Sequence, residues 1–161
     1  MSHGTSNSEL DALVGPTRLH KRLYTDPEIF ELEMQRIWGQ AWIFIGHASQ
    51  IPNAGDFFTT HINHRVPVVM VRDKAGDIHV LHNRCAHKGA KLVEERQGNV
   101  PGAFRCAYHG WTYRHDGSLL KIPNPSGYDD TGFDMSSPCN NMQKVAQYDS
   151  YRGFVFATLS P

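Results

Sequence analysis

The spacing of apolar residues changes near Gly39. Before it, four apolar residues recur at the intervals of one face of an amphipathic helix: Phe30, Met34, Ile37 and Trp38. The pattern predicts a helix over residues 25–38, with Gly39 as its stop. Two N-terminal caps fit equally well, either Asp26 followed by Pro27 or a capping box formed by Thr25 and Glu28. We expect the apolar face of this helix to pack against the core or another domain.

After Gly39 the chain is divided into short runs rich in β-branched and aromatic residues, separated by Gly, Pro, Asn and Asp. Eight strands are predicted, at residues 42–45, 57–62, 66–71, 78–81, 104–106, 112–114, 119–122 and 154–159. Short strands without a second long helix indicate an all-β fold, an antiparallel β-sandwich or small barrel. Residues 1–20 are polar and predict a loose arm, and residues 126–141 a surface loop. We therefore expect an arm and helix over residues 1–39 and one β domain over residues 40–161.

Composition limits the possible functions. The 161 residues hold 16 basic and 16 acidic side chains, and this neutral balance argues against a nucleic-acid-binding protein. No apolar run is long enough to span a membrane, and the N-terminus lacks the pattern of a signal peptide. Three cysteines suit a reducing cytoplasm better than a secreted disulfide scaffold. Ten histidines are unusual and suggest metal ligands.

Two short motifs place a cysteine beside a histidine. Cys85 and His87 form C-x-H. After eighteen intervening residues, Cys106 and His109 form C-x-x-H. Both pairs lie at predicted strand ends and are followed closely by glycine, Gly89 and Gly110, which would let backbone N–H groups approach the sulfur atoms. Thiolate and imidazole ligands together suit zinc or an iron–sulfur centre.

Zinc is one interpretation of these motifs, as part of a zinc-stabilised β module. Structural Cys₂His₂ zinc sites usually take two cysteines from one element and two histidines from a helix. Here each loop supplies one cysteine and one histidine. This mixture fits a Rieske [2Fe–2S] cluster better, with both cysteines on one iron and both histidines on the other.

Other reactive or aromatic residues have ordinary interpretations. Cys139 is expected to be a loop thiol, and Tyr108 and Trp111 are expected to pack in the core while partly shielding the cluster. The pairs His61/His64 and His79/His82 are three residues apart in strands, so their side chains point to opposite faces and a second metal site is not expected. Pro123 and Pro125 predict a turn.

Together these motifs resemble a known family. Residues 83–90 (NRCAHKGA), 98–99 (GN), 104–113 (FRCAYHGWTY) and 116–119 (DGSL) are similar to the Rieske domain of ring-hydroxylating oxygenase large (alpha) subunits. The helix leading into Trp42 and the segment 151–156 (YRGFVF) resemble it too, so the likeness covers residues 20–160. Its general appearance is that of the benzoate, anthranilate and salicylate branch. The resemblance implies a Rieske-type antiparallel β-sandwich with its cluster loops at one end.

The resemblance also implies roles for single residues. Cys85 and Cys106 would bind the inner iron and His87 and His109 the outer iron, surrounded by Lys88, Gly89, Tyr108, Gly110 and Trp111. Lys88 stands where the family more often has arginine; it keeps the charge but loses the guanidinium fork. Neither loop has the extra cysteine of cytochrome-complex Rieske proteins, which places the expected potential towards the low end of the Rieske range.

In this family, oxygen chemistry belongs to a second domain with a mononuclear iron held by two histidines and a carboxylate. No such pattern is found in this sequence, so we expect the electron-transfer part of an aromatic-ring hydroxylating dioxygenase cut at a domain border. The resemblance implies a reductase or ferredoxin as electron donor, with NAD(P)H as its source, and neighbouring alpha subunits, in some members with beta subunits. A free-standing Rieske ferredoxin is the alternative, which the N-terminal helix disfavours.

Overall fold

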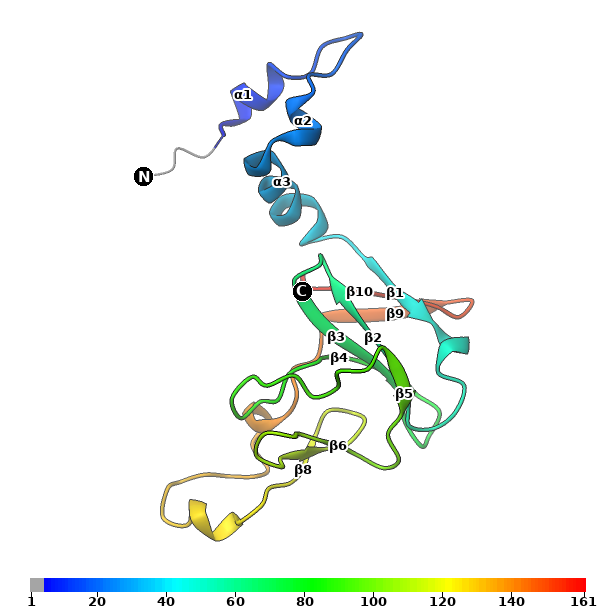
Figure 1. Cartoon of the computed structure of the whole chain (residues 1–161), viewed down its shortest axis with the longest axis vertical. Helices are drawn as coiled ribbons and strands as arrows, with labels where there is room; N and C mark the ends of the chain where they lie inside the picture. Colours follow the sequence, from blue (N-terminus) through cyan, green and yellow to red (C-terminus); the bar gives the residue numbers. More distant parts are fainter. Residues whose placement is uncertain (1–4) are drawn as a thin grey trace. The chain divides into compact units, whose positions relative to one another are not determined.

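The computed structural model describes residues 5–161 and divides the chain into two units that meet between Ala41 and Trp42. The first unit holds the helices α1 (Asn7–Asp11), α2 (Arg22–Thr25) and α3 (Pro27–Glu33), followed by a π-helical turn, Met34–Trp38. The second unit holds ten strands (Figure 1). Each unit is described on its own below.

The first unit differs from the sequence prediction in two respects. Residues 7–11 form a helix instead of a loose arm, because the Ser6 hydroxyl and the Glu9 carboxylate cap it reciprocally; residues 1–4 of the predicted arm lie outside the described part. The helix expected over residues 25–38 is divided into α2, α3 and the π turn, since Asp26 leaves the helical conformation and caps α3 by accepting the Glu28 N–H.

The predicted apolar face of that helix is not buried. Phe30, Ile37 and Trp38 are all exposed, whereas Ile29, the neighbour of Phe30, is the buried side chain of α3. The segment Met34–Trp38 is π-helical, with hydrogen bonds from residue i to residue i+5. This wider turn also rotates Ile37 and Trp38 relative to α3. Within the described part of the first unit, no other element covers this face.

The ten strands of the second unit form three antiparallel sheets. Their order is β1–β10–β9, β4–β3–β2–β5 and β6–β7–β8 (Figure 1). The strands are β1 (Ile43–His47), β2 (Asp56–Ile62), β3 (Val66–Arg72), β4 (Ile78–His82), β5 (Gln97–Asn99), β6 (Phe104–Arg105), β7 (Thr112–Tyr113), β8 (Leu119–Lys121), β9 (Gln147–Tyr151) and β10 (Phe154–Thr158). The predicted all-β antiparallel fold is confirmed, and all eight predicted strands are present with small shifts at their ends.

Strands β5 and β9 were missed by the sequence prediction. All three residues of β5 are exposed, and in β9 only Tyr148 is partly buried. Without buried side chains, neither strand shows the alternation of apolar and polar residues that marks a strand in a sequence.

The middle sheet is buried on both faces. Val68 and Met70 of β3 pack towards the sheet β1–β10–β9, while Val69 and Val71 pack on the opposite side with residues of the sheet β6–β7–β8. Burial on both faces explains why β3 is apolar at nearly every position and does not alternate. The second of these two cores contains Cys85 and Cys106, so the candidate ligands are anchored in the interior of the unit.

Candidate metal centre

The four candidate ligands lie on two loops with the same backbone hydrogen bonds. In the first loop the Cys85 N–H donates to the Ala90 carbonyl oxygen at 2.8 Å, and the Gly89 N–H to the Cys85 carbonyl oxygen at 2.8 Å. In the second loop the Cys106 N–H donates to the Trp111 carbonyl oxygen at 2.8 Å, and the Gly110 N–H to the Cys106 carbonyl oxygen at 3.0 Å. Two segments of different sequence therefore close in the same way.

Glycine is required in these loops for a reason other than the one expected. Gly89 and Gly110 both have φ = +73°, a conformation that residues with a side chain rarely adopt. Their N–H groups bond carbonyl oxygens and do not reach the sulfur atoms. The backbone N–H of His87 is the one that acts on the Cys85 sulfur, where it lowers the pKa of the thiol and partly offsets the effect of burial.

The two cysteines are buried and the two histidines lie further out. Cys85 and Cys106 belong to the core, whereas His87 is half-buried and His109 is exposed. The imidazole rings are neighbours, with centroids 4.8 Å apart. The loops thus bring together one pair of thiols and one pair of imidazoles, the donor set of a two-iron cluster.

An unpaired nitrogen supports this fit. Nδ1 of His87 is buried and has no hydrogen-bond partner, which is costly for a buried polar atom. Coordination of a metal would satisfy such an atom. Within residues 5–161 no three His, Cys, Asp or Glu side chains are arranged to hold one common metal ion.

Burial is the largest influence on the pKa of Cys85 and of His87. Burial raises the pKa of the Cys85 thiol, and the neighbouring Cys106 raises it further. A coordinated thiol, however, is deprotonated by the metal itself. Burial lowers the pKa of His87, and the positive charges of His109 and Lys88 lower it further. Both shifts favour the neutral forms, and a neutral imidazole is the form that binds a metal.

The surrounding residues predicted from the sequence have different environments. Trp111 is buried, with 4% of its surface exposed, and lies parallel to the His87 ring at 4.8 Å. Tyr108 was expected to pack in the core, but it is 66% exposed and stacks on His109. Lys88 is exposed beside them. Pro123 lies against Gly110, so the turn that contains it borders the second loop.

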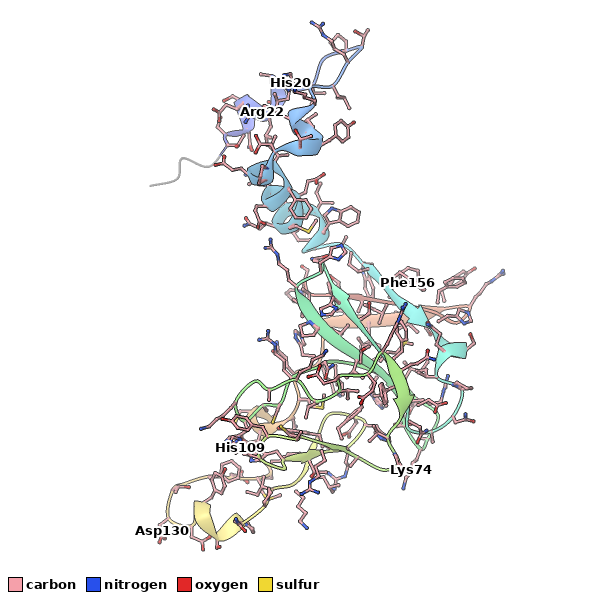
Figure 2. The ribbon with its side chains drawn as sticks, viewed as in Figure 1. His20, Arg22, Lys74, His109, Asp130 and Phe156 are labelled. Carbon is pink, nitrogen blue, oxygen red and sulfur yellow. The ribbon has the colours of Figure 1, made fainter. Side chains whose placement is uncertain are left out.

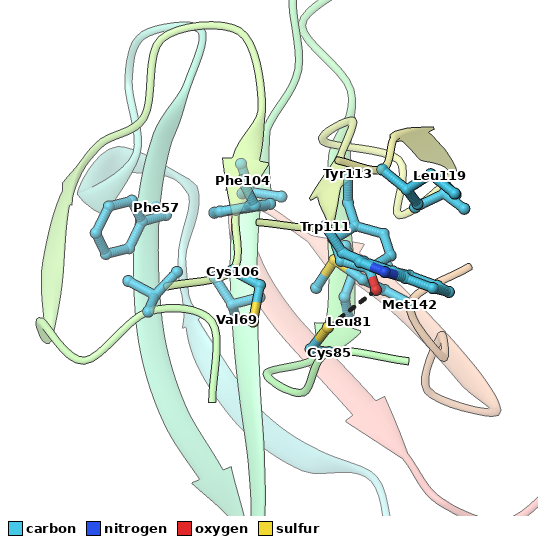
Figure 3. Packing of buried hydrophobic residues seen from close by; sticks show 13 residues of the cluster. Phe57, Val69, Leu81, Cys85, Phe104, Cys106, Trp111, Tyr113, Leu119 and Met142 are labelled. Atoms are coloured by element: carbon cyan, nitrogen blue, oxygen red, sulfur yellow. Dashed lines mark hydrogen bonds between the residues drawn. The ribbon is translucent and has the colours of Figure 1, made fainter. Parts of the chain in front are cut away.

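Two residues contribute to the site although their roles were not predicted. The Tyr113 hydroxyl lies 3.1 Å from the Cys85 sulfur, and also accepts the Ala86 N–H (Figure 3). Its pKa is strongly raised by burial and by the contact with Cys85, so the phenol remains protonated. Asn83, which is fully buried, bonds the backbone of Leu92 and Val93 and so fixes the segment that follows the first loop.

The remaining candidate ligands lie elsewhere. Cys139 is exposed, with the Ser137 hydroxyl 3.1 Å from its sulfur. His79 bonds Asp73 at 2.9 Å, and His61 and His64 are exposed.

Comparison with known proteins identifies the second unit. The pattern of the Rieske [2Fe-2S] domain family matches residues 41–149. The chain belongs to the Rieske [2Fe-2S] domain family. The cofactor of this family is a [2Fe–2S] cluster, and electron transfer is its function. The match favours the cluster over the zinc interpretation of the two Cys/His motifs.

Relatives of this Rieske protein are subunits of oxygenases. It is 39% identical over 154 residues to toluate 1,2-dioxygenase subunit alpha of Pseudomonas putida, covering 94% of this chain and 33% of the relative. It is 41% identical over 145 residues to the anthranilate 1,2-dioxygenase large subunit of Acinetobacter baylyi, covering 90% of this chain and 30% of that one. The chain therefore spans about one third of the length of these relatives.

A solved structure supports the same fold. Naphthalene 1,2-dioxygenase from Rhodococcus sp. bound to indole superposes with a TM-score of 0.85 at 32% identity, over 98% of this chain and 36% of that chain. The Rieske fold predicted from the motifs is thus confirmed, and the chain covers the Rieske part of these oxygenases.

No helix in the described residues has the length and apolar character needed to cross a membrane.

Proposed function

We propose that Cys85, Cys106, His87 and His109 hold the [2Fe–2S] cluster, with the cysteines on one iron and the histidines on the other. The observation that carries this proposal is the matching closure of the two loops, which brings two buried thiols and two neighbouring imidazoles to one site. The unpaired Nδ1 of His87 also supports the proposal, because this buried nitrogen would gain a partner by binding a metal.

The same geometry suggests how electrons reach the site. When bound, the cluster supplies one-electron redox chemistry. His109 and Tyr108 are exposed, so this side of the centre is open to a partner protein, while the cysteine side lies in the core. The buried Trp111 packs beside His87 and limits water there, and Lys88 adds positive charge at the exposed edge. We infer that electrons enter or leave on the histidine side.

In its full context the protein is proposed to be the alpha subunit of an aromatic-ring hydroxylating dioxygenase. The Rieske domain would receive electrons that originate from NAD(P)H, through a reductase or ferredoxin, and pass them to a mononuclear non-haem iron in a second domain. Similarity to the toluate and anthranilate dioxygenase subunits supports this assignment. Assembly with neighbouring alpha subunits, with or without beta subunits, and a cytoplasmic location belong to the same proposal.

Metal and sulfide analysis of the 161-residue protein, purified without oxygen, tests the ligand assignment. We expect two irons and two acid-labile sulfides per chain and a visible spectrum that bleaches on reduction. Cys85→Ser and His109→Ala should abolish the cluster. Cys139→Ser and His61→Ala change an exposed cysteine and an exposed histidine and should leave it intact. One zinc per chain without sulfide, or a coloured Cys85→Ser variant, would refute the assignment.

A further inference from the structure

The segment between β8 and β9 carries two aromatic side chains into the interior. Residues 125–141 are mostly exposed, and Asp130 lies at the outer end of this segment, away from the sheets (Figure 2). Tyr128 and Phe133 differ from their neighbours because they are partly buried and pack against the core that contains Trp111. A segment predicted as a polar surface loop thus packs against the core beside the candidate ligands, and Phe133 contacts Trp111.

The contact continues as a row of rings. Centroids are 4.5 Å apart between Tyr128 and Phe133, 5.8 Å between Phe133 and Trp111, and 4.8 Å between Trp111 and His87. Phe133 meets Trp111 edge to face, at 65°, whereas Trp111 lies parallel to His87, at 6°. Both arrangements are favourable for aromatic pairs.

Stacking on Trp111 restrains the plane of the His87 ring. Its Nδ1 has no hydrogen-bond partner in the protein, so a hydrogen bond to that atom does not fix the plane of the ring. The parallel Trp111 restricts rotation on one face, and His109 lies nearby at a steep angle. The indole must itself be held, and Phe133 and Tyr113 are its aromatic neighbours.

We propose that Phe133 is a positioning residue for the metal centre: it holds Trp111 in place, and Trp111 orients His87. Phe133 also packs edge to face against Trp111, so its ring would limit the access of water to the indole beside His87. This inference rests on the proposed function, because the orientation of His87 matters only if His87 is a ligand. It assigns a role at the metal centre to the loop between β8 and β9, which lies outside the two Cys/His motifs.

The expected direction follows from charge. A cluster held by two thiolates and two neutral imidazoles is uncharged when oxidised and carries one negative charge when reduced. Water stabilises the charged form more. Removing the Phe133 ring admits water beside Trp111, and should therefore favour reduction.

The test compares Phe133→Ala with two matched variants in the cluster-containing protein. Met135→Ala removes an exposed apolar side chain from the same segment, and Phe133→Tyr keeps the ring. For Phe133→Ala we expect an equilibrium constant for reduction raised at least threefold, about 28 mV at 59 mV per tenfold for one electron. The electron paramagnetic resonance spectrum of the reduced protein should also change. Met135→Ala and Phe133→Tyr should match the wild type in both measurements.

Several outcomes would overturn the inference. If Phe133→Ala keeps its iron but shows the wild-type potential and spectrum, the residue has no positioning role, even if the melting temperature falls. If Phe133→Ala does not fold, Phe133→Leu decides, since it keeps apolar bulk without the ring; a wild-type potential and spectrum for that variant refute the proposal. A wild-type protein without iron and sulfide would instead refute the proposed function.

Discussion

The hydroxyl of Tyr113 lies 3.1 Å from the sulfur of Cys85, although the two residues are 28 positions apart in the chain. Tyr113 belongs to β7 and Cys85 to the first loop, so this hydrogen bond joins the two halves of the proposed metal centre. The same hydroxyl accepts the Ala86 N–H, which leaves its own proton available for the sulfur. If Cys85 is coordinated as a thiolate, as proposed, the contact places a neutral donor against its sulfur.

Replacing Tyr113 by phenylalanine should lower the reduction potential. Hydrogen bonds to cluster sulfurs stabilise the more negative, reduced form, so their loss favours the oxidised form. We expect a decrease on the order of 60 mV, a tenfold change in the one-electron equilibrium constant, measured by redox titration of the visible spectrum. Tyr151→Phe alters an exposed tyrosine and should not change the potential. An unaltered potential in Tyr113→Phe would contradict the prediction.

Replacing Asn83 by alanine should destabilise the fold around the first loop. The Asn83 side chain makes three hydrogen bonds, to the Leu92 and Val93 N–H groups and the Val93 carbonyl oxygen. Loss of these partners leaves buried polar groups unsatisfied, at a cost of about 3 kcal/mol. Urea unfolding measures the change in the free energy of unfolding, with the exposed Asn99→Ala as control. An equal decrease in the free energy of unfolding in both variants would show that the buried hydrogen bonds of Asn83 contribute no more than those of an exposed asparagine.

The glycines of the two loops offer a matched pair of substitutions. Gly89 and Gly110 share φ = +73°, so alanine costs about 1 kcal/mol of backbone strain at either position. A Cβ on Gly89 meets no atom within 4 Å, whereas on Gly110 it would lie 2.7 Å from Cγ of Pro123. We therefore expect Gly110→Ala to lower the free energy of unfolding by ~2 kcal/mol more than Gly89→Ala does. The comparison is made by urea unfolding, and a larger loss for Gly89→Ala would be incompatible with the packing described.

Stability should fall in acid because of Asp73. Burial alone would raise the pKa of this carboxyl, but hydrogen bonds from His79 and from backbone N–H groups outweigh burial and lower it. The pKa of an aspartate in an unfolded chain is about 3.9. The carboxylate therefore contributes stability above that pH, and the contribution is lost as the pH falls through the lower pKa of the folded state.

Asp73→Asn should accordingly lower the melting temperature at pH 7, while the difference from the wild type shrinks towards pH 3. Thermal unfolding at a series of pH values measures this convergence. Asp77→Asn changes an exposed carboxylate in the same turn and serves as control. A constant difference between Asp73→Asn and the wild type at all pH values would exclude the proposed linkage.

The sequence was most informative where side chains are buried or carry chemistry. Apolar runs such as residues 66–71 predicted strands, and the two Cys/His motifs predicted the loops and the family. Strands β5 and β9 were not predictable in this way, because their stability comes from backbone pairing with β2 and β10 and not from buried side chains. The short helix Asn7–Asp11 depends on its capping box, a signal present in the sequence but not recognised.

Contacts between distant segments could not be read from local patterns. The roles of Tyr113 and Phe133 depend on which rings and atoms the folded sheets bring together, and neither residue lies within either Cys/His motif. Tyr108 shows the converse error: an aromatic residue in the motif suggested packing, but its position next to His109 on the loop directs it outward. Burial of single loop residues is decided by tertiary structure.

The pairing of β1 with β10 has a consequence for how this domain can be combined with others. Ile43 is paired with Ala157, so the polypeptide enters and leaves the second unit side by side. A unit with adjacent ends can be inserted into a longer polypeptide as a cassette, with little change to the path of the host chain. Such an architecture permits circular permutation: joining the two ends by a short linker and opening the chain at an exposed turn, such as that around Ala75, should preserve both ligand loops.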